Sequence, residues 1–339
     1  MNIQDAIKAL VAGRSLRQNE AALVMEQIMT GEATPAQIGA LLTVLHLKGE
    51  TDAEIAGMAE VMREKAVQVH HAMPVLDTCG TGGDATNTFN ISTAAAFIAA
   101  GAGATVAKHG NRAMSSKCGS ADVLEGLGVA IELDAEGVAR CLDRAGIGFM
   151  FAQKFHPAMR FAGPVRREIG IRTVFNILGP LANPARAEYQ VVGVAAAPLA
   201  DKLANALARM GSRHALVVHG SDGMDELSLS GPSTIWEVKT GGAPHRYQVD
   251  PTDLGLRRAP REALLGGTVA ENAATIRALL NGDEQGARRD VVLLNAAAGL
   301  VASEQAQDLR EGLTLAARAL DEGAARARLD QLVVVSQSA

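Results

Sequence analysis

From Pro74 onward the chain alternates between short runs rich in β-branched residues, glycine-containing turns and alanine-rich stretches of helical length. Such runs predict buried strands, and helices between most of them indicate a mainly parallel sheet. The predicted strands are residues 75–78, 104–107, 189–194 and 215–218, and the predicted closing helices are 270–281, 290–303 and 311–332. The alternation therefore predicts an α/β fold, with a mainly parallel β-sheet flanked by helices in a large domain of residues 74–168 and 185–339.

Residues 1–70 show a different pattern, with two strong signals for the start of a helix. Thr34 is followed by a proline and then by Gln37, and Thr51 is followed three residues later by Glu54. Both are capping boxes, which predict a small all-helical domain. Residues 169–184, rich in asparagine, glycine and proline, interrupt the α/β pattern. We interpret them as a hinge segment that returns to the helical domain.

The composition limits the kinds of partner that we expect. The chain has 339 residues, a formal net charge of -5 and 3% aromatic residues, so neither a broad basic face nor base stacking is predicted. Its three cysteines form no CxxC pair, which is typical of a reducing compartment. The chain contains no apolar run of about 18 residues, so no membrane-spanning helix is predicted. We therefore expect a cytoplasmic protein with no nucleic-acid or membrane partner.

A glycine-rich loop, Asp77 to Asp84, directly follows the first predicted strand. Glycines let a backbone approach a ligand and turn its N–H groups toward an anion, although a plain turn has the same composition. The spacing fits neither a Walker A loop nor a GxGxxG fingerprint. In the next segment Asn90, Ser92 or Thr93 can cap an alanine-rich helix. The N-terminus of that helix is suited to phosphate, with an ordinary cap as the alternative.

The segment Lys108 to Asp122 follows the second predicted strand and is unusually rich in polar and charged residues. Because the carboxyl ends of parallel strands share one edge, we expect this segment and the glycine loop to face one crevice. Lys108 and Arg112 can bind phosphate there, as a point charge and as a bidentate fork. Neutral hydroxyl donors accompany them at Ser115, Ser116 and Ser120. The alternatives are a solvated loop and a structural role for His109 or Arg112.

Two further segments offer ligand-binding side chains. Asp225 and Glu226 are hard oxygen ligands of the kind that Mg²⁺ takes, with an exposed acidic turn as the alternative. Arg160, Arg166 and Arg167 can pair with a substrate carboxylate or can be helix-surface charges. The sequence contains no HExxH or CxxC set and no recognisable Ser-His-Asp arrangement. We therefore predict no catalytic nucleophile, and chemistry by positioning and charge stabilisation.

Taken in chain order, these motifs resemble those of the anthranilate phosphoribosyltransferase family. They are Gly80-Thr81-Gly82-Gly83-Asp84, Asn90-Ile91-Ser92-Thr93, Lys108-His109-Gly110-Asn111-Arg112, Ser115-Ser116 with Gly119-Ser120-Ala121-Asp122, His156-Pro157-Ala158-Met159-Arg160, and Asp225-Glu226. The resemblance covers essentially the whole chain. It implies a homodimer joined through the helical domain, and transfer of phosphoribosyl from 5-phosphoribosyl 1-diphosphate to the amine of anthranilate in tryptophan biosynthesis.

The resemblance also implies roles for individual residues. The implied donor-binding residues are Gly80, Gly83, Asp84, Thr88, Asn90, Ile91, Ser92, Thr93, Lys108, His109, Gly110, Asn111, Arg112, Ala113, Met114, Ser115, Ser116 and Ser120. The implied anthranilate-binding residues are Gly80, Asn111 and Arg166. The implied ligands of Mg²⁺, the expected cofactor, are Ser92, Asp225 and Glu226.

Two other functions are weighed against this one. Pyrimidine nucleoside phosphorylases share the architecture, but Lys108-His109-Gly110-Asn111-Arg112 stands where they carry a Lys-x-Ser-Gly-Arg run. A non-catalytic relative that binds nucleic acid is expected to have basic patches and broken donor motifs. This chain is acidic overall and keeps the motifs.

Overall fold

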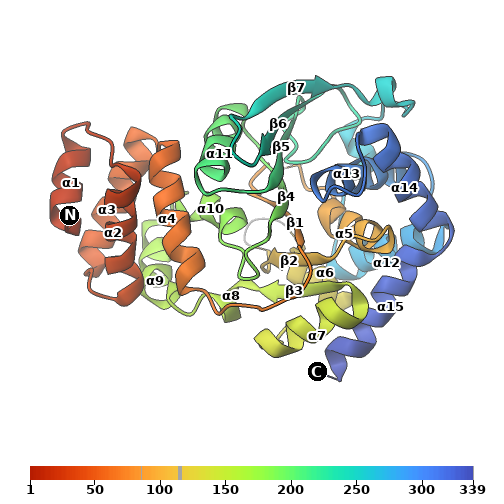
Figure 1. Cartoon of the computed structure of the whole chain (residues 1–339), viewed down its shortest axis with the longest axis horizontal. Coiled ribbons are helices and arrows are strands. Elements are labelled where there is room, and N and C mark those ends of the chain that lie inside the picture. The colour runs from red at the N-terminus through yellow and green to blue at the C-terminus, as the bar shows by residue number, and fades with distance from the viewer. Residues whose placement is uncertain (85, 114–116, 339) are drawn as a thin grey trace.

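A seven-stranded sheet lies at the centre of the molecule, with helices on both sides (Figure 1). The structure is a computed structural model that describes residues 1–84, 86–113 and 117–338. The strand order is β3-β2-β1-β4-β5-β6-β7; the first five strands in this order are parallel, and β6 and β7 are antiparallel additions. The strands are β1 (Leu76–Gly80), β2 (Val106–Gly110), β3 (Ile147–Phe151), β4 (Tyr189–Gly193), β5 (His214–Gly220), β6 (Ser233–Lys239) and β7 (His245–Val249).

One face of the sheet is covered by helices arranged around α5 (Ile91–Gly101), in which nine of eleven residues are buried. Small residues let neighbouring helices come close: at Gly101 a Cβ atom would lie 2.6 Å from the backbone nitrogen of Ala325. The other helices of this part are α6 (Ser120–Gly126), α7 (Ala135–Ala145), α12 (Val269–Asn281), α13 (Ala287–Ala302), α14 (Leu309–Asp321) and α15 (Ala324–Gln337). The alanine-rich sequence thus produces a dense helical layer.

The N-terminal helices form a bundle beside the sheet, at the left of Figure 1. They are α1 (Ile3–Val11), α2 (Gln18–Thr30), α3 (Pro35–Lys48) and α4 (Asp52–Lys65). The chain returns to them after β3 through α8 (Ala152–Phe155), α9 (Met159–Ile169) and α10 (Phe175–Leu178). A continuous apolar core joins this bundle through α11 (Ala197–Arg209) to the second face of the sheet. Of these helices, α9 packs on α2 and α3, so contact with the bundle starts before the predicted returning segment of residues 169–184.

Both predicted capping boxes are confirmed. The hydroxyl of Thr34 accepts a hydrogen bond from the Gln37 backbone at 3.3 Å, and the Gln37 side chain accepts one from the Thr34 backbone at 2.9 Å. Thr51 and Glu54 make the same reciprocal pair at 3.2 and 2.8 Å. These bonds satisfy N–H groups that the first helical turn leaves unpaired.

The α/β class and the four predicted strands are confirmed, whereas β3, β6 and β7 were not predicted. β7 is an edge strand with polar, largely exposed side chains, so it lacks the apolar run by which a buried strand is recognised. The predicted helix 311–332 is in fact two helices, because Gly323 adopts a positive φ of 77° between α14 and α15. Among the described residues, the helices are all too short or too polar to cross a bilayer.

Candidate functional site

The carboxyl edge of the parallel strands gathers most of the predicted ligand-binding segments. β1 lies between β2 and β4, so the connections that leave the sheet there run in opposite directions. Open α/β sheets form a crevice at such a switch point. The loops that follow β1, β2 and β5 all begin at this edge. The expectation that the first two face one crevice fits this topology.

Glycines at the ends of the strands let the turn after β5 lie directly on β1 and β4. A Cβ atom at Gly193 would lie 1.6 Å from the backbone oxygen of Asp225, and one at Gly80 would lie 2.4 Å from its carboxylate oxygen Oδ2. That oxygen accepts a hydrogen bond of 2.9 Å from the backbone N–H of Gly82. The glycine loop and the acidic turn therefore form one unit.

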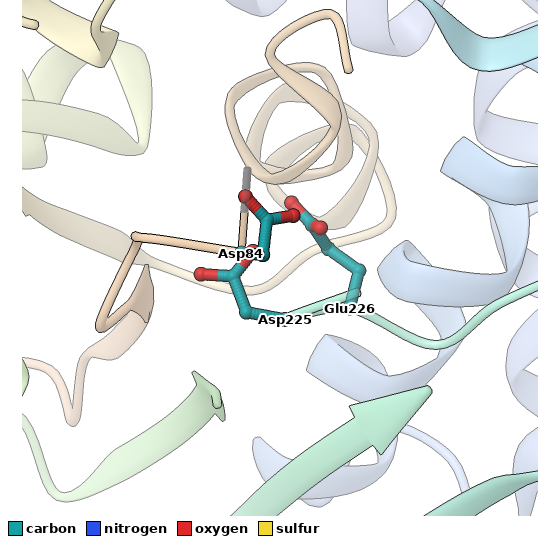
Figure 2. A group of neighbouring side chains, drawn as sticks. All are labelled: Asp84, Asp225 and Glu226. Atoms are coloured by element: carbon teal, nitrogen blue, oxygen red, sulfur yellow. The ribbon is translucent and has the colours of Figure 1, made fainter. Parts of the chain in front are cut away.

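Three carboxylates converge in this unit, from Asp84, Asp225 and Glu226 (Figure 2). One oxygen of each lies within 4.8 Å of the others. Burial, and then repulsion by Asp84, raises the pKa of Asp225 to about 6. Burial and the other two carboxylates raise the pKa of Glu226 well above its usual value. Crowded carboxylates of this kind favour protonation unless a cation neutralises them.

The same carboxylates fit a magnesium ion. Oxygen Oε2 of Glu226 is buried and has no hydrogen-bond partner among the described residues. A buried acceptor without a donor is costly, and a hard divalent cation is a partner that carboxylate oxygens bind well. Asp84, which was predicted to bind the donor, belongs to this cluster with the predicted metal ligands Asp225 and Glu226. The third predicted metal ligand, Ser92, lies in the first turn of α5.

Lys108 reaches from β2 to the start of α5. Its ammonium group lies 3.4 Å from the hydroxyl of Ser92 and 3.3 Å from that of Thr78, and it donates at close range to the Thr78 carbonyl. Burial lowers the pKa of Lys108, while the negative groups around it, including Asp77, oppose that change. The predicted phosphate-binding lysine is therefore held at a helix N-terminus.

The N-cap position of α5 belongs to Asn90, but its side chain makes no cap hydrogen bond. Instead its amide donates to the carbonyl of Cys118 at 3.1 Å and accepts from the side chain of Asn272 at 3.0 Å. Asn90 thus connects α5 with the loop before α6 and with α12. Sequence reasoning missed Asn272, because an asparagine in a predicted helix gives no sign of its burial or of its partner.

Arg112 is already paired with carboxylates. Its guanidinium donates to Asp122 at 3.0 Å and to Glu125, with one contact of 3.0 Å. Hydrogen bonds to Glu125 and Asp122 raise the pKa of Arg112. The predicted phosphate fork therefore has two protein partners in this structure. Of the neighbouring predicted residues, Met114, Ser115 and Ser116 lie outside the described ones.

Asp122 organises the described parts of this loop. One of its oxygens accepts hydrogen bonds from the backbone N–H groups of Ala113, at 2.9 Å, and Gly119, at 2.8 Å. The carbonyl of Asn111 accepts from the hydroxyl of Ser120 at 3.3 Å. A Cβ atom at Gly110 would lie 2.2 Å from that hydroxyl oxygen, so the loop turns back onto the end of β2.

His109 takes part in a buried pair. Its Nδ1 lies 3.2 Å from the carbonyl oxygen of Gly179, and its Nε2 lies 3.2 Å from Nε2 of His156. Because a carbonyl only accepts, Nδ1 of His109 carries the proton in its contact with Gly179. Burial, and then the neighbouring imidazole, lowers the pKa of His109 to about 3. Burial lowers the pKa of His156 to about 4.

Of the predicted arginines, Arg166 lies on α9 with its guanidinium 5.2 Å from the centre of the Phe175 ring, and burial lowers its pKa.

Arg172 was not predicted. It donates to the carbonyl of Gly82 at 3.3 Å, and a Cβ atom at Gly83 would lie 1.6 Å from its guanidinium. An arginine thus contacts the glycine loop from the segment that follows α9. Thr88, a predicted donor-binding residue, pairs with Leu265 in a short antiparallel β-bridge.

Known proteins resemble this chain over nearly its full length. Residues 72–326 match the model described as "Glycosyl transferase family, a/b domain", and residues 4–66 match "Glycosyl transferase family, helical bundle domain". The anthranilate phosphoribosyltransferase of Chloroflexus aggregans is 70% identical over 337 residues, which cover 99% of each chain.

Two solved structures extend this similarity to the fold. The crystal structure of anthranilate phosphoribosyltransferase from Thermus thermophilus has a TM-score of 0.91 at 46% identity, covering 98% of this chain and 99% of that one. The enzyme from Saccharomyces cerevisiae in complex with PRPP and Mg has a TM-score of 0.91 at 27% identity, covering 99% and 98%.

Proposed function

This chain belongs to the anthranilate phosphoribosyltransferase family, and we propose that it transfers the phosphoribosyl group of 5-phosphoribosyl 1-diphosphate to the amine of anthranilate. The products are N-(5-phosphoribosyl)anthranilate and pyrophosphate, in the second step of tryptophan synthesis from chorismate. One observation carries the proposal: Asp84, Asp225 and Glu226 meet at the edge of the sheet where α5 begins. Carboxylates for a metal beside a helix N-terminus suit a metal-bound diphosphate.

The donor's diphosphate is the group that leaves, so the site must stabilise negative charge that develops on it. Lys108, the hydroxyl of Ser92 and the N–H groups at the start of α5 supply positive charge and donors. Magnesium bound by Asp225 and Glu226, with Ser92 as a further ligand, would neutralise part of the same charge. The Saccharomyces cerevisiae structure that holds PRPP and Mg supports magnesium as the cofactor.

The acceptor needs orientation more than activation. The aromatic amine of anthranilate is neutral near pH 7, so its lone pair is available without a strong base. Arg166 on α9 is proposed to bind the anthranilate carboxylate, with Asn111 and Gly80 completing the acceptor site. Holding the nitrogen in line with the ribose carbon can supply roughly 7–11 kcal/mol of the barrier reduction. This mechanism agrees with the prediction that the reaction needs no catalytic nucleophile.

We further propose that residues 1–70 and the segment 169–184 form a mobile helical domain that closes on the donor. The contact from Arg172 to the Gly82 carbonyl, at 3.3 Å, supports closure because it joins this segment to the glycine loop. Closure would exclude water and limit donor hydrolysis. Replacing Arg172 with alanine is then expected to raise the release of pyrophosphate when anthranilate is absent, and an unchanged rate would contradict the proposal.

Homodimerisation through the helical domain is also proposed. Large apolar side chains are exposed on three of its helices or their ends: Val11 (69% exposed), Leu23 (48%) and Leu47 (78%). Sedimentation of the protein and of its Leu23→Glu variant tests this, since the variant is expected to be monomeric.

The three free cysteines support the proposal that the enzyme works in the reducing cytoplasm.

The transfer itself is tested by mixing the protein with anthranilate, 5-phosphoribosyl 1-diphosphate and Mg²⁺. We expect anthranilate fluorescence to fall as pyrophosphate is released in equal amount, and a chelator to stop both. Phosphorolysis of thymidine and uridine is measured in parallel, because a pyrimidine nucleoside phosphorylase would show it. Phosphorolysis without loss of anthranilate would overturn the proposal.

A further inference from the structure

The helix α13 contains one buried amide that its own packing does not require. Residues 291–302 of this helix are all buried, and all but one of them are apolar or glycine. The exception is Asn295, whose exposed fraction is 5%. Burying an amide costs free energy unless its donors and acceptor are paired. The partners of Asn295 should therefore show what it does.

Those partners lie in the acidic turn, far away in the sequence. Oxygen Oδ1 of Asn295 accepts from the backbone N–H of Leu227 at 3.0 Å, and Nδ2 donates to the Leu227 carbonyl at 3.0 Å. The second hydrogen of Nδ2 goes to the Val291 carbonyl, one turn back in α13, at 2.9 Å. One side chain thus binds both polar groups of a single residue, as a neighbouring strand would.

Leu227 directly follows Glu226, so this pair fixes the backbone on one side of the two acidic residues. On the other side, the carboxylate of Asp225 is fixed by the Gly82 N–H at 2.9 Å. Glu226 itself offers the buried oxygen that has no partner among the described residues. The acidic pair is therefore held between two anchors, one from the sheet edge and one from α13.

We propose that Asn295 is a positioning residue for the metal–diphosphate site, and that it keeps Glu226 directed toward the ion. This inference rests on the proposed function. Residues that orient metal ligands without touching the metal typically change affinity about 10–100-fold when removed. Leucine has nearly the shape of asparagine, so Asn295→Leu preserves packing while leaving both polar groups of Leu227 unpaired.

Magnesium pyrophosphate is the probe, with binding measured by calorimetry on the full chain. Wild type, Asn295→Leu and the milder Asn295→Ser are titrated with pyrophosphate, both with excess Mg²⁺ and with a chelator. The matched control is Ser303→Ala, because Ser303 is also buried and caps the C-terminal end of α13, but its hydroxyl donates to Gly299 and Leu300 of that helix and not to the acidic turn. Circular dichroism establishes that each variant is folded.

We expect the Asn295 variants to bind magnesium pyrophosphate about tenfold or more weakly than wild type, and to bind metal-free pyrophosphate unchanged. Ser303→Ala should match wild type in both titrations. If a folded Asn295 variant keeps wild-type affinity with magnesium, or loses equal affinity without it, the inference is wrong. Should Asn295→Leu fail to fold, Asn295→Ser decides.

The same titrations separate this inference from the proposed function. If Asn295 controls the magnesium-dependent binding but the protein does not consume anthranilate, the positioning role stands and the acceptor is wrong. If anthranilate is consumed but the Asn295 variants bind magnesium pyrophosphate normally, the transfer stands and the positioning role falls. Failure of wild type to bind pyrophosphate more tightly with magnesium overturns the inference as well.

Discussion

The carboxylate of Asp225 accepts a hydrogen bond from the backbone N–H of Gly82, 2.9 Å away, and so joins the turn after β5 to the loop after β1. These two segments are far apart in the sequence. They meet because only β4 lies between β1 and β5 in the sheet. A change in either segment should therefore affect the same ligand.

Neutralising the acidic turn should raise the requirement for magnesium. Asp225→Asn and Glu226→Gln keep the size of each side chain but remove a charged metal ligand. We expect the magnesium concentration for half-maximal rate to rise about 10–100-fold. Initial rates over a magnesium titration test this, with the exposed Asp283→Asn as control. An unchanged titration would return Asp225 and Glu226 to an ordinary acidic turn.

Gly193 should not tolerate alanine. The added Cβ atom would lie 1.6 Å from the backbone oxygen of Asp225, so the acidic turn must move away from the sheet. We expect a loss of about 1–3 kcal/mol in the free energy of unfolding, together with a higher magnesium requirement. Urea titration measures the first effect. Gly179→Ala is the control, since nothing lies within 4 Å of its added Cβ atom, and equal losses in both would refute the steric argument.

Arg166 should matter more for anthranilate than for the donor. Removing a cation that binds a carboxylate costs about 1–3 kcal/mol, equivalent to about 5–150-fold in affinity. Arg166→Ala is expected to raise the KM for anthranilate by that factor and to leave the KM for the donor nearly unchanged. The exposed neighbour Arg167 gives the matched control, Arg167→Ala. Equal effects on both substrates would contradict an acceptor role.

Asp122 and Glu125 should have opposite effects on donor binding. Asp122→Asn weakens the hydrogen bonds from Ala113 and Gly119, so the loop loses its organiser and the KM for the donor should rise severalfold. Glu125 contacts Arg112, and Glu125→Gln should free that guanidinium for a phosphate and lower the donor KM. Steady-state kinetics at saturating anthranilate separate the two. A rise in both variants would mean that Arg112 must stay paired.

The buried pair of His109 and His156 should make the fold sensitive to acid. Their pKa values are lowered to about 3 and about 4, whereas an ordinary histidine, as in the unfolded chain, has a pKa near 6.5. The unfolded chain therefore binds protons first as pH falls below 6.5, and stability drops by up to about 1.4 kcal/mol for each unit of pKa difference. Stability from this pair is complete above pH 6.5.

Urea titrations at about pH 7 and about pH 4.5 measure this effect. His156→Gln should show a smaller difference between the two conditions than wild type. The exposed His46→Gln controls for the loss of an imidazole. If wild type and His156→Gln lose the same stability, the pair does not contribute to the acid sensitivity.

Local signals in the sequence predicted much of the fold and the general position of the site. Capping boxes at Thr34 and Thr51 depend on neighbours a few residues away, and so do the apolar runs of β1, β2, β4 and β5. β7 was missed because an exposed edge strand needs no apolar run.

The partners within the site could not be predicted in the same way. Asn272 and Asn295 make hydrogen bonds to residues far away in the sequence. Neither α12 nor α13 carries a sequence motif that predicts these partners. The sequence predicts that Arg112 binds phosphate, but its guanidinium pairs with Asp122 and Glu125. Both carboxylates lie on α6, which packs beside the loop that holds Arg112. Such pairings follow from the packing of whole elements rather than from residue type.

The position of α13 has a consequence for how the protein is made. The last strand ends at Val249, and α13 begins only at Ala287. During synthesis, every strand of the sheet is therefore available before the helix that anchors the acidic turn. We expect a chain interrupted between these points to expose an apolar sheet face, which favours aggregation and binding by chaperones. The acidic turn therefore gains its second anchor only after α13 has been synthesised.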